Sequence, residues 1–207
     1  MAESLLSYAL TTVARVKARL TITVSAHDTI LLYLINSVTD FIEGECNRRF
    51  KETTYTNEVY SIPNAGNGFL VLKQSPVSAV SSLQFRAGLK SNPNWTEFVT
   101  DTWELMEDGA PGIIQIYGAF IQGLNSVRAT YTAGYKINFS NYGDLTTHTL
   151  PADLTDLAER LVVKSFKRRE SEGKEREVMA NSMTIWKDLL GPEDWDTINK
   201  YRRVNFF

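Results

Sequence analysis

Apolar residues recur at three- and four-residue spacing in two long stretches, one near each end of the chain. In residues 28–46 this spacing predicts a helix that Ser25 or Asp28 caps and that is buried on more than one side. In residues 150–172 it predicts a second long helix, with Pro151 in the first turn and the charges gathered at the end. The chain therefore begins and ends with helical segments.

Two shorter helices accompany these long ones. Residues 13–20 follow Thr11 and Thr12, either of which can cap a helix. After Gly191 and Pro192, acidic residues come first and basic residues last, an order that complements the helix dipole. The sequence therefore predicts a C-terminal helix here.

Between residues 53 and 135 the pattern changes to short alternating runs rich in Thr, Tyr and Val. Gly, Asn and Pro separate these runs, which predicts an antiparallel sheet or a small barrel-like unit. The glycine-rich run at residues 65–68 lies between predicted strands and not before a helix, so it is interpreted as a hairpin turn and not a phosphate-binding loop. Residues 87–94, AGLKSNPN, are expected to form a loop.

Together these patterns predict an α+β fold, a helical bundle with an inserted antiparallel β region and a C-terminal helix. Residues 1–207 are treated as a single domain because no linker rich in Pro, Gly or Ser divides them. Its expected parts are N-terminal helices at 11–50, an inserted β region at 53–135, a core helix at 150–172 and a C-terminal docking segment at 173–207. Residues 1–10 are interpreted as a flexible or partner-docked arm.

Composition narrows the class of protein. The 207 residues carry a formal net charge of -2, which gives no overall attraction to nucleic acid or anionic lipid. The longest apolar run, residues 29–35, is too short to span a bilayer, and the N-terminus lacks the basic region of a secretion signal. Cys46 is the single cysteine, which excludes an intrachain disulfide and fits a reducing compartment. It lies on the apolar side of a predicted helix and is expected to be packed rather than reactive.

The sequence contains no catalytic motif and no metal-ligand spacing, so no catalytic residue, metal ligand or cofactor is assigned. His27 and His148 are far apart in the sequence, and His27 is interpreted as a surface residue at a helix start. Asp144 and His148, in a polar loop at residues 136–148, could act together as a base. A hydrolase that uses this pair is the minor alternative to a protein without catalysis.

Two groups of charged residues could meet partners. Carboxylates between residues 97 and 108 are interpreted as a solvated face, with a basic rim on a partner as the alternative. Basic residues at the end of the 150–172 helix could neutralise a few phosphates or form intermolecular salt bridges. The salt-bridge interpretation is favoured because residues 151–207 hold equal numbers of acidic and basic residues. The candidate channel or inter-subunit charges are Lys164, Lys167, Arg168 and Arg169.

The end of the chain carries residue types that dominate the energy of protein interfaces. These are Tyr201, Arg202, Arg203, Phe206 and Phe207. An exposed tail does not normally carry them, so they either fold back on the core of the chain or dock against another chain.

With these elements in place, the chain resembles the head-to-tail connector (head completion or adaptor) proteins of tailed double-stranded DNA phages and their prophage relatives. The matching segments follow the order usual for that family and cover nearly the whole chain. They are LTTVARVKARLTIT, HDTILLYLINSVTDFIEGECNRRF, LVLKQSPVSAVSSLQF, VRATYTAGY, LPADLTDLAERLVVKSF and YRR.

The resemblance implies a structural virion protein that is not an enzyme and uses no membrane. It implies a homo-oligomeric ring, typically of twelve copies, bound to the portal protein at the head–tail junction of a virion made in the cytoplasm of a host bacterium. The ring would extend the DNA channel without sequence-specific binding and offer a surface to the next neck or tail protein. In such relatives the C-terminal segment docks on the portal, which adds Trp186 and Trp195 to the docking residues. Truncation after Gly191 is therefore expected to leave a folded protein that no longer joins the portal.

The alternative from the same compartment is another neck or tail-completion ring, such as a stopper or a tail-terminator-like protein. Binding separates the two, because an adaptor is expected to associate with the portal and to be missing from purified tails.

Overall fold

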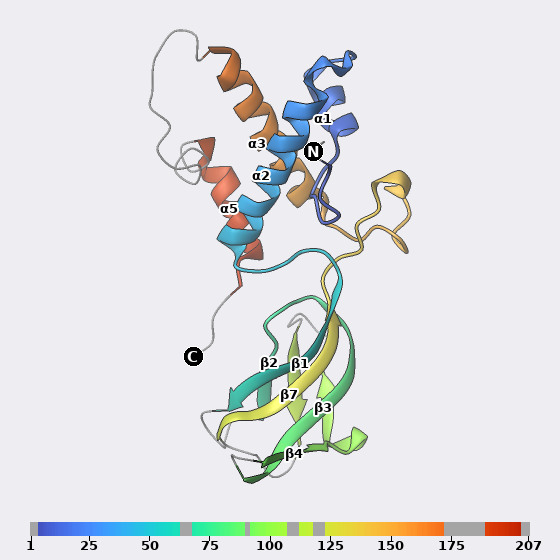
Figure 1. Cartoon of the computed structure of the whole chain (residues 1–207), viewed down its shortest axis with the longest axis vertical. Coiled ribbons are helices and arrows are strands. Elements are labelled where there is room, and N and C mark those ends of the chain that lie inside the picture. Colours follow the sequence, from blue (N-terminus) through green and yellow to red (C-terminus); the bar gives the residue numbers. More distant parts are fainter. Residues whose placement is uncertain are drawn as a thin grey trace. The chain divides into compact units, whose positions relative to one another are not determined.

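The computed structural model of the chain divides into a helical unit, residues 1–50 and 136–205, and a β unit, residues 51–135 (Figure 1). The predicted α+β class is confirmed, with helices on both sides of an antiparallel β region in the sequence. No helix among the described residues combines the length and apolar character needed to cross a bilayer. The structure describes residues 4–62, 68–89, 92–106, 112–117, 123–171 and 189–203.

The helical unit is built around two long helices whose buried faces are rich in Leu, Ile and Val. Its helices are α1 (Val13–Leu20), α2 (Asp28–Cys46), α3 (Ala152–Ser171) and α5 (Pro192–Tyr201), with 3-10 turns at Ser25–His27 and Phe139–Asn141. The four α-helices among the described residues lie where the sequence predicts helices. 

The helix ends follow local chemistry. The Thr12 side chain accepts a hydrogen bond from the Arg15 N–H, which confirms the predicted cap of α1. By contrast, α2 begins after the 3-10 turn and has no side-chain cap, so the prediction that Ser25 or Asp28 caps it is wrong. It ends at Asn47, whose left-handed backbone (φ 51°) directs its N–H back to the Gly44 carbonyl.

The core of the helical unit lies between α2 and α3, and α5 adds to it. Leu31, Ile35 and Ile42 of α2 are fully buried, and so is Ile198 of α5. On α3 the fully buried residues are Leu154, Leu157, Leu161 and Val162. Each such side chain contributes about 1.5–3 kcal/mol by leaving water. The last helix therefore belongs to the core of this unit.

Residues 4–10 pack along α2. Ala9 and Leu10 are buried. The Leu6 N–H donates to Asn36 Oδ1 at 3.1 Å, and the Leu10 N–H donates to Thr39 Oγ1 at 3.2 Å. The prediction of a flexible or partner-docked arm is wrong for these residues. Polar side chains on α2 satisfy the backbone of a segment that forms no helix of its own, a pairing that short-range periodicity does not reveal.

The β unit contains two antiparallel sheets. The first has the strand order β1 (Thr53–Ile62), β7 (Gly123–Ala133), β3 (Val77–Leu89) and β4 (Asn92–Glu97). The second has the order β2 (Phe69–Val71), β6 (Ile113–Ile116) and β5 (Trp103–Leu105), with a 3-10 turn at Thr100–Thr102. Figure 1 shows the long β1, β7 and β3 strands side by side. 

The side chains that alternate inward on these strands form one apolar core, which includes Leu83, Ile114, Val127 and Tyr131. The expectation of a loop at residues 87–94 is wrong. β3 continues to Leu89 and pairs there with Asn92 of β4, because cross-strand pairing overrides the turn preference of Gly, Asn and Pro. Residues 63–67 lie outside the described residues, so the predicted hairpin turn stays a prediction.

Candidate assembly surface of the helical unit

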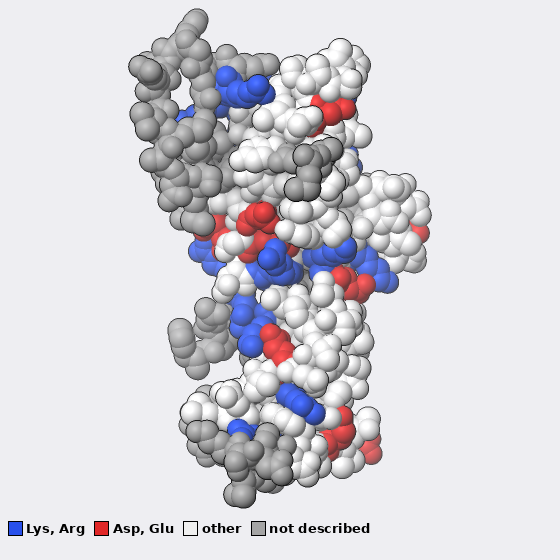
Figure 2. Space-filling model, viewed as in Figure 1, with Lys and Arg blue, Asp and Glu red and all other residues white. Residues whose placement is uncertain are grey.

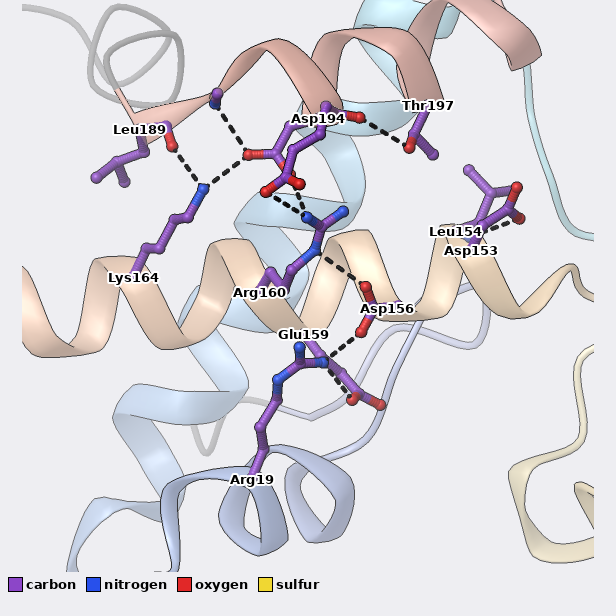
Figure 3. Close-up of polar contacts among 12 residues, drawn as sticks. Arg19, Asp153, Leu154, Asp156, Glu159, Arg160, Lys164, Leu189, Asp194 and Thr197 are labelled. Atoms are coloured by element: carbon purple, nitrogen blue, oxygen red, sulfur yellow. Dashed lines mark hydrogen bonds and ion pairs between the residues drawn. The ribbon is translucent and has the colours of Figure 1, made fainter.

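The polar side of α3 links α1 on one flank to α5 on the other. Glu159 is almost fully buried and accepts hydrogen bonds from Thr11 Oγ1 at 3.2 Å and Arg15 Nε at 2.6 Å. Arg19 of α1 pairs with both Glu159 (3.2 Å) and Asp156 (2.6 Å). Figure 3 shows Arg19 reaching from α1 to these two carboxylates. A buried carboxylate with this many partners fixes the position of α1 on α3.

Asp194 holds α5 on the other flank of α3 (Figure 3). Its side chain is fully buried, and its Oδ2 accepts hydrogen bonds from Lys164 Nζ at 2.7 Å and from the Gly191 N–H at 3.0 Å. Arg160 forms an ion pair with its Oδ1 at 3.1 Å. Burial opposes ionisation of this carboxyl, but the hydrogen bonds from Lys164 and Gly191 and the nearby positive charges hold its pKa below the ordinary value. Asp194 therefore accepts the Gly191 N–H at the N-terminus of α5 and also holds α5 against α3.

The far end of α5 is tied to the end of α2 and the start of α3. The Tyr201 hydroxyl donates to Asp153 Oδ1 at 2.7 Å, and the Tyr201 ring lies edge-on to Phe50 with centroids 6.3 Å apart. Burial and the hydrogen bond to Asp153 raise the pKa of Tyr201 to about 12. Tyr201 therefore uses its ring and its hydroxyl within the helical unit.

The other predicted docking residues differ in how much surface they present. Arg202 is exposed, and its Nε donates to the Glu45 carbonyl at 3.0 Å. The Arg203 N–H donates to the Cys46 carbonyl at 2.9 Å, and Arg203 is half-buried. Trp195 is half-buried on α5. The structure thus brings Trp195, Tyr201, Arg202 and Arg203 onto one helix and its end, whereas Trp186, Phe206 and Phe207 lie outside the described residues.

The four candidate basic residues of α3 differ in whether they are engaged within the subunit. Lys164 is engaged inside the unit, since it donates to Asp194 and, at 3.1 Å, to the Leu189 carbonyl. Lys167 and Arg169 are exposed and Arg168 is half-buried. Figure 2 shows Lys and Arg side chains gathered over the C-terminal end of α3. Of the four candidate charges, the last three remain on the surface of the subunit.

The arrangement of His148 and Asp144 does not suit hydrolysis. His148 is buried, and its Nδ1 accepts a hydrogen bond from the Asn138 N–H at 3.0 Å. The Asp144 carboxylate instead accepts from the N–H and hydroxyl of Thr146, at 2.9 Å and 2.6 Å. Burial and the charge of Arg15 lower the pKa of His148, which favours the neutral ring. The two side chains serve the local structure of their loop.

The two other potentially reactive side chains, Cys46 and His27, are packed within the helical unit. Cys46 is fully buried and burial raises the pKa of its thiol to about 11, as expected for a packed cysteine. His27 is half-buried, with its ring edge-on to Phe166 at 5.3 Å. Among the described residues, no group of three His, Cys, Asp or Glu side chains could hold a metal ion.

A family comparison bears directly on the function of the chain. Residues 10–83, from the start of α1 into β3, match the model of the phage gp6-like head-tail connector protein family. The match covers less than half of the chain, and it confirms the resemblance to head-to-tail connector proteins.

Solved structures share the fold of this chain over nearly its whole length. A subunit from the neck of an empty gene transfer agent (GTA) particle, computed with C6 symmetry, aligns with a TM-score of 0.58 and 20% identity, covering 94% of this chain and 90% of that one. A subunit from the neck of a native GTA particle, computed with C12 symmetry, aligns with a TM-score of 0.54 and 20% identity over the same shares. No curated protein sequence matches the chain.

Sequence reasoning missed the two carboxylates that organise this surface. Glu159 receives its partners from residues 140 or more positions away, and Asp194 receives Lys164 from 30 positions away. One local signal existed for Asp194, because an acid three residues after Gly191, at the start of a helix, can accept the first free N–H groups. 

Proposed function

We propose that the chain is a structural protein of the neck of a phage-like virion, where copies of it form a ring between the capsid portal and the tail. The observation that carries this proposal is the family match of residues 10–83, together with a fold shared along 94% of the chain with a subunit of a particle neck. The ring would extend the DNA channel and present an attachment surface to the next neck or tail protein.

The surface charges support passage of DNA without sequence-specific binding. The chain carries a net charge of -2, so a ring of it exerts no strong overall attraction on the duplex. We assign Lys167, Arg168 and Arg169 to the channel wall or to salt bridges with the neighbouring copy. Lys164 leaves this group, since Asp194 of the same subunit binds it.

The C-terminal helix is the proposed portal-docking element. Three residues of this helix and its end remain at least partly accessible to solvent: Trp195, Arg202 and Arg203. Trp and Arg are the residue types that most often anchor interfaces. Tyr201 positions this element, because its ring packs on Phe50 and its hydroxyl binds Asp153. Trp186, Phe206 and Phe207 remain proposed docking residues from the sequence.

Binding to purified portal tests both the function and the docking element. The chain is expected to bind portal rings, and the double variant Trp195→Ala and Arg203→Ala is expected to weaken binding by about tenfold or more, since hot-spot residues contribute 2 kcal/mol or more. Asp196→Ala, which removes an exposed side chain of the same helix, serves as the matched control and is expected to bind like the parent.

The same assay distinguishes the alternative ring proteins. A chain that does not bind the portal but co-purifies with tails made without heads would be a tail-completion or terminator-like ring. A chain that binds only to portal already carrying another neck protein would be a stopper.

A further inference from the structure

Residues 136–149 form a loop that is closed at its base and contains a buried histidine. The Thr149 N–H donates to the Lys136 carbonyl at 2.9 Å, and the Lys136 N–H donates to Thr149 Oγ1 at 3.0 Å. Lys136 and Thr149 are exposed, whereas His148 is only 3% exposed. The loop therefore holds one titratable ring out of water although its two ends lie at the surface.

Aromatic contacts connect this ring to α1. The His148 ring lies 5.0 Å from the Phe139 ring and 4.7 Å from the Tyr142 ring, measured between centroids. The Arg15 guanidinium of α1 lies 4.3 Å from the centroid of the Tyr142 ring. Tyr142 thus contacts both the histidine of its own loop and a cation of α1, so the position of the histidine affects how the loop is held on the helix.

The hydrogen bond of the histidine requires a neutral ring. The Asn138 N–H donates to His148 Nδ1 at 3.0 Å, so Nδ1 carries a lone pair and the ring proton lies on Nε2. Nε2 is buried and has no hydrogen-bond partner within the described part of the chain. A protonated ring would carry a second N–H at Nδ1, directed at the Asn138 N–H, and its positive charge would be buried without an acceptor.

The charged side chains around the ring do not compensate such a charge. Arg15 of α1 is itself a cation, and its Nε donates to Glu159 of α3 at 2.6 Å. Within the loop, the Asp144 carboxylate accepts hydrogen bonds from neighbouring threonines, and the Lys136 ammonium donates to a loop carbonyl. Burial and the charge of Arg15 accordingly lower the pKa of His148.

We propose that acidification releases this loop from α1, because protonation of His148 breaks its hydrogen bond and its ring contacts and separates Tyr142 from Arg15. The backbone hydrogen bonds at the base of the loop involve no titratable atom, so the release is local and the helices keep their core. The inference requires neither a ring of copies nor a partner, so its failure would leave the proposed function untouched.

The direction of the pH effect follows from the protonation of the two states. Above about pH 6.5, the ordinary pKa of histidine, the ring is neutral whether the loop is bound or released, so pH has no effect on the contact. Below that pH the released ring binds a proton more readily than the buried ring. The released fraction is therefore expected to rise about tenfold per pH unit until the buried ring is protonated as well.

An NMR titration of the isotope-labelled full chain from about pH 8 to about pH 4.5 tests the proposal. His148 is expected to be protonated only below the ordinary pKa of histidine. In the same step the Asn138 amide is expected to lose protection from hydrogen exchange about tenfold per pH unit, after correction for the intrinsic effect of pH on exchange. The Thr149 amide at the base of the loop and the amides of α2 and α3 are expected to keep their protection.

His148→Asn is the variant that removes the titrating group. Its amide oxygen accepts a hydrogen bond from the Asn138 N–H but binds no proton in this range, so the step is expected to disappear. His27→Asn, at the other histidine of the chain, is the matched control and is expected to keep the step. Circular dichroism checks that both variants fold.

Three results would overturn the proposal. The first is protonation of His148 at or above the ordinary pKa of histidine. The second is an Asn138 amide that does not follow this protonation, and the third is loss of protection in α2 and α3 at the same pH, since the change would then not be local. Where His148→Asn leaves the loop unbound at neutral pH, the titration of the parent chain decides by itself.

Discussion

Ending the chain after Gly191 is expected to destabilise the helical unit by more than about 4 kcal/mol, as measured by urea unfolding followed by circular dichroism. The truncation removes Ile198, which is fully buried, and the Tyr201 ring that packs on Phe50. It also removes Asp194, the partner of Lys164 on α3. This expectation reverses the one drawn from the sequence, in which the last helix served only to dock.

Two point variants separate the contributions to this loss. Ile198→Ala is expected to cost about 2–5 kcal/mol, because it leaves a cavity beside Cys46 in the core. Asp196→Ala, at an exposed position of the same helix, is expected to change stability by less than about 0.5 kcal/mol. If the truncated chain unfolds at the same urea concentration as the full chain, α5 is not part of the core and the account of this helix is wrong.

Gly134→Ala is expected to destabilise the β unit by about 3 kcal/mol or more. Gly134 has a φ of 113°, and an added Cβ would lie 2.7 Å from the Glu52 nitrogen and from the carbonyl carbon and oxygen of Lys51. These are backbone atoms of the chain segment that enters β1, so no side-chain rotation relieves the clash. The Glu52 N–H also donates to the Tyr135 carbonyl at 2.8 Å, a contact that the displaced backbone would lose.

Gly143→Ala, in the loop before α3 of the helical unit, is the control for a glycine whose added Cβ meets no neighbour. Its added Cβ would have no heavy atom within 4 Å, and its backbone is not in the left-handed region, so stability is expected to hold or to rise by up to about 1 kcal/mol. Unfolding is followed by tryptophan fluorescence, since Trp95 and Trp103 lie in the β unit. Equal stability of the two variants would contradict the close approach at Gly134.

The Gly134 contact explains part of what the sequence could and could not predict. The segment VRATYTAGY could be recognised as a strand, and β7 confirms it, but the reason for its glycine lies in the approach of Lys51 and Glu52 from 80 positions earlier in the chain. Periodicity likewise located α2 and α3, because burial on one face is a local pattern, whereas cap residues located α1 and the order of charges located α5.

Contacts between distant segments account for the errors. Residues 4–10 carry no periodic pattern, yet Asn36 and Thr39 hold them on α2. The turn-like composition of residues 87–94 was overridden by pairing of β3 with β4. At the candidate surface, the aromatic and arginine-rich end of the chain could be recognised by residue type. The sequence could not show that the Tyr201 ring packs on Phe50 and its hydroxyl binds Asp153, whereas Arg203 is half-buried.

The most direct measurement of the central claim follows the fate of heads and tails made without this chain. If the chain is a neck ring protein, cells that lack it are expected to accumulate DNA-filled heads and complete tails that remain separate, as counted by electron microscopy after gradient fractionation. Adding the purified chain to the mixed extracts is expected to restore joined particles. Joined particles formed in its absence, or tails that are themselves incomplete, would contradict a role between portal and tail.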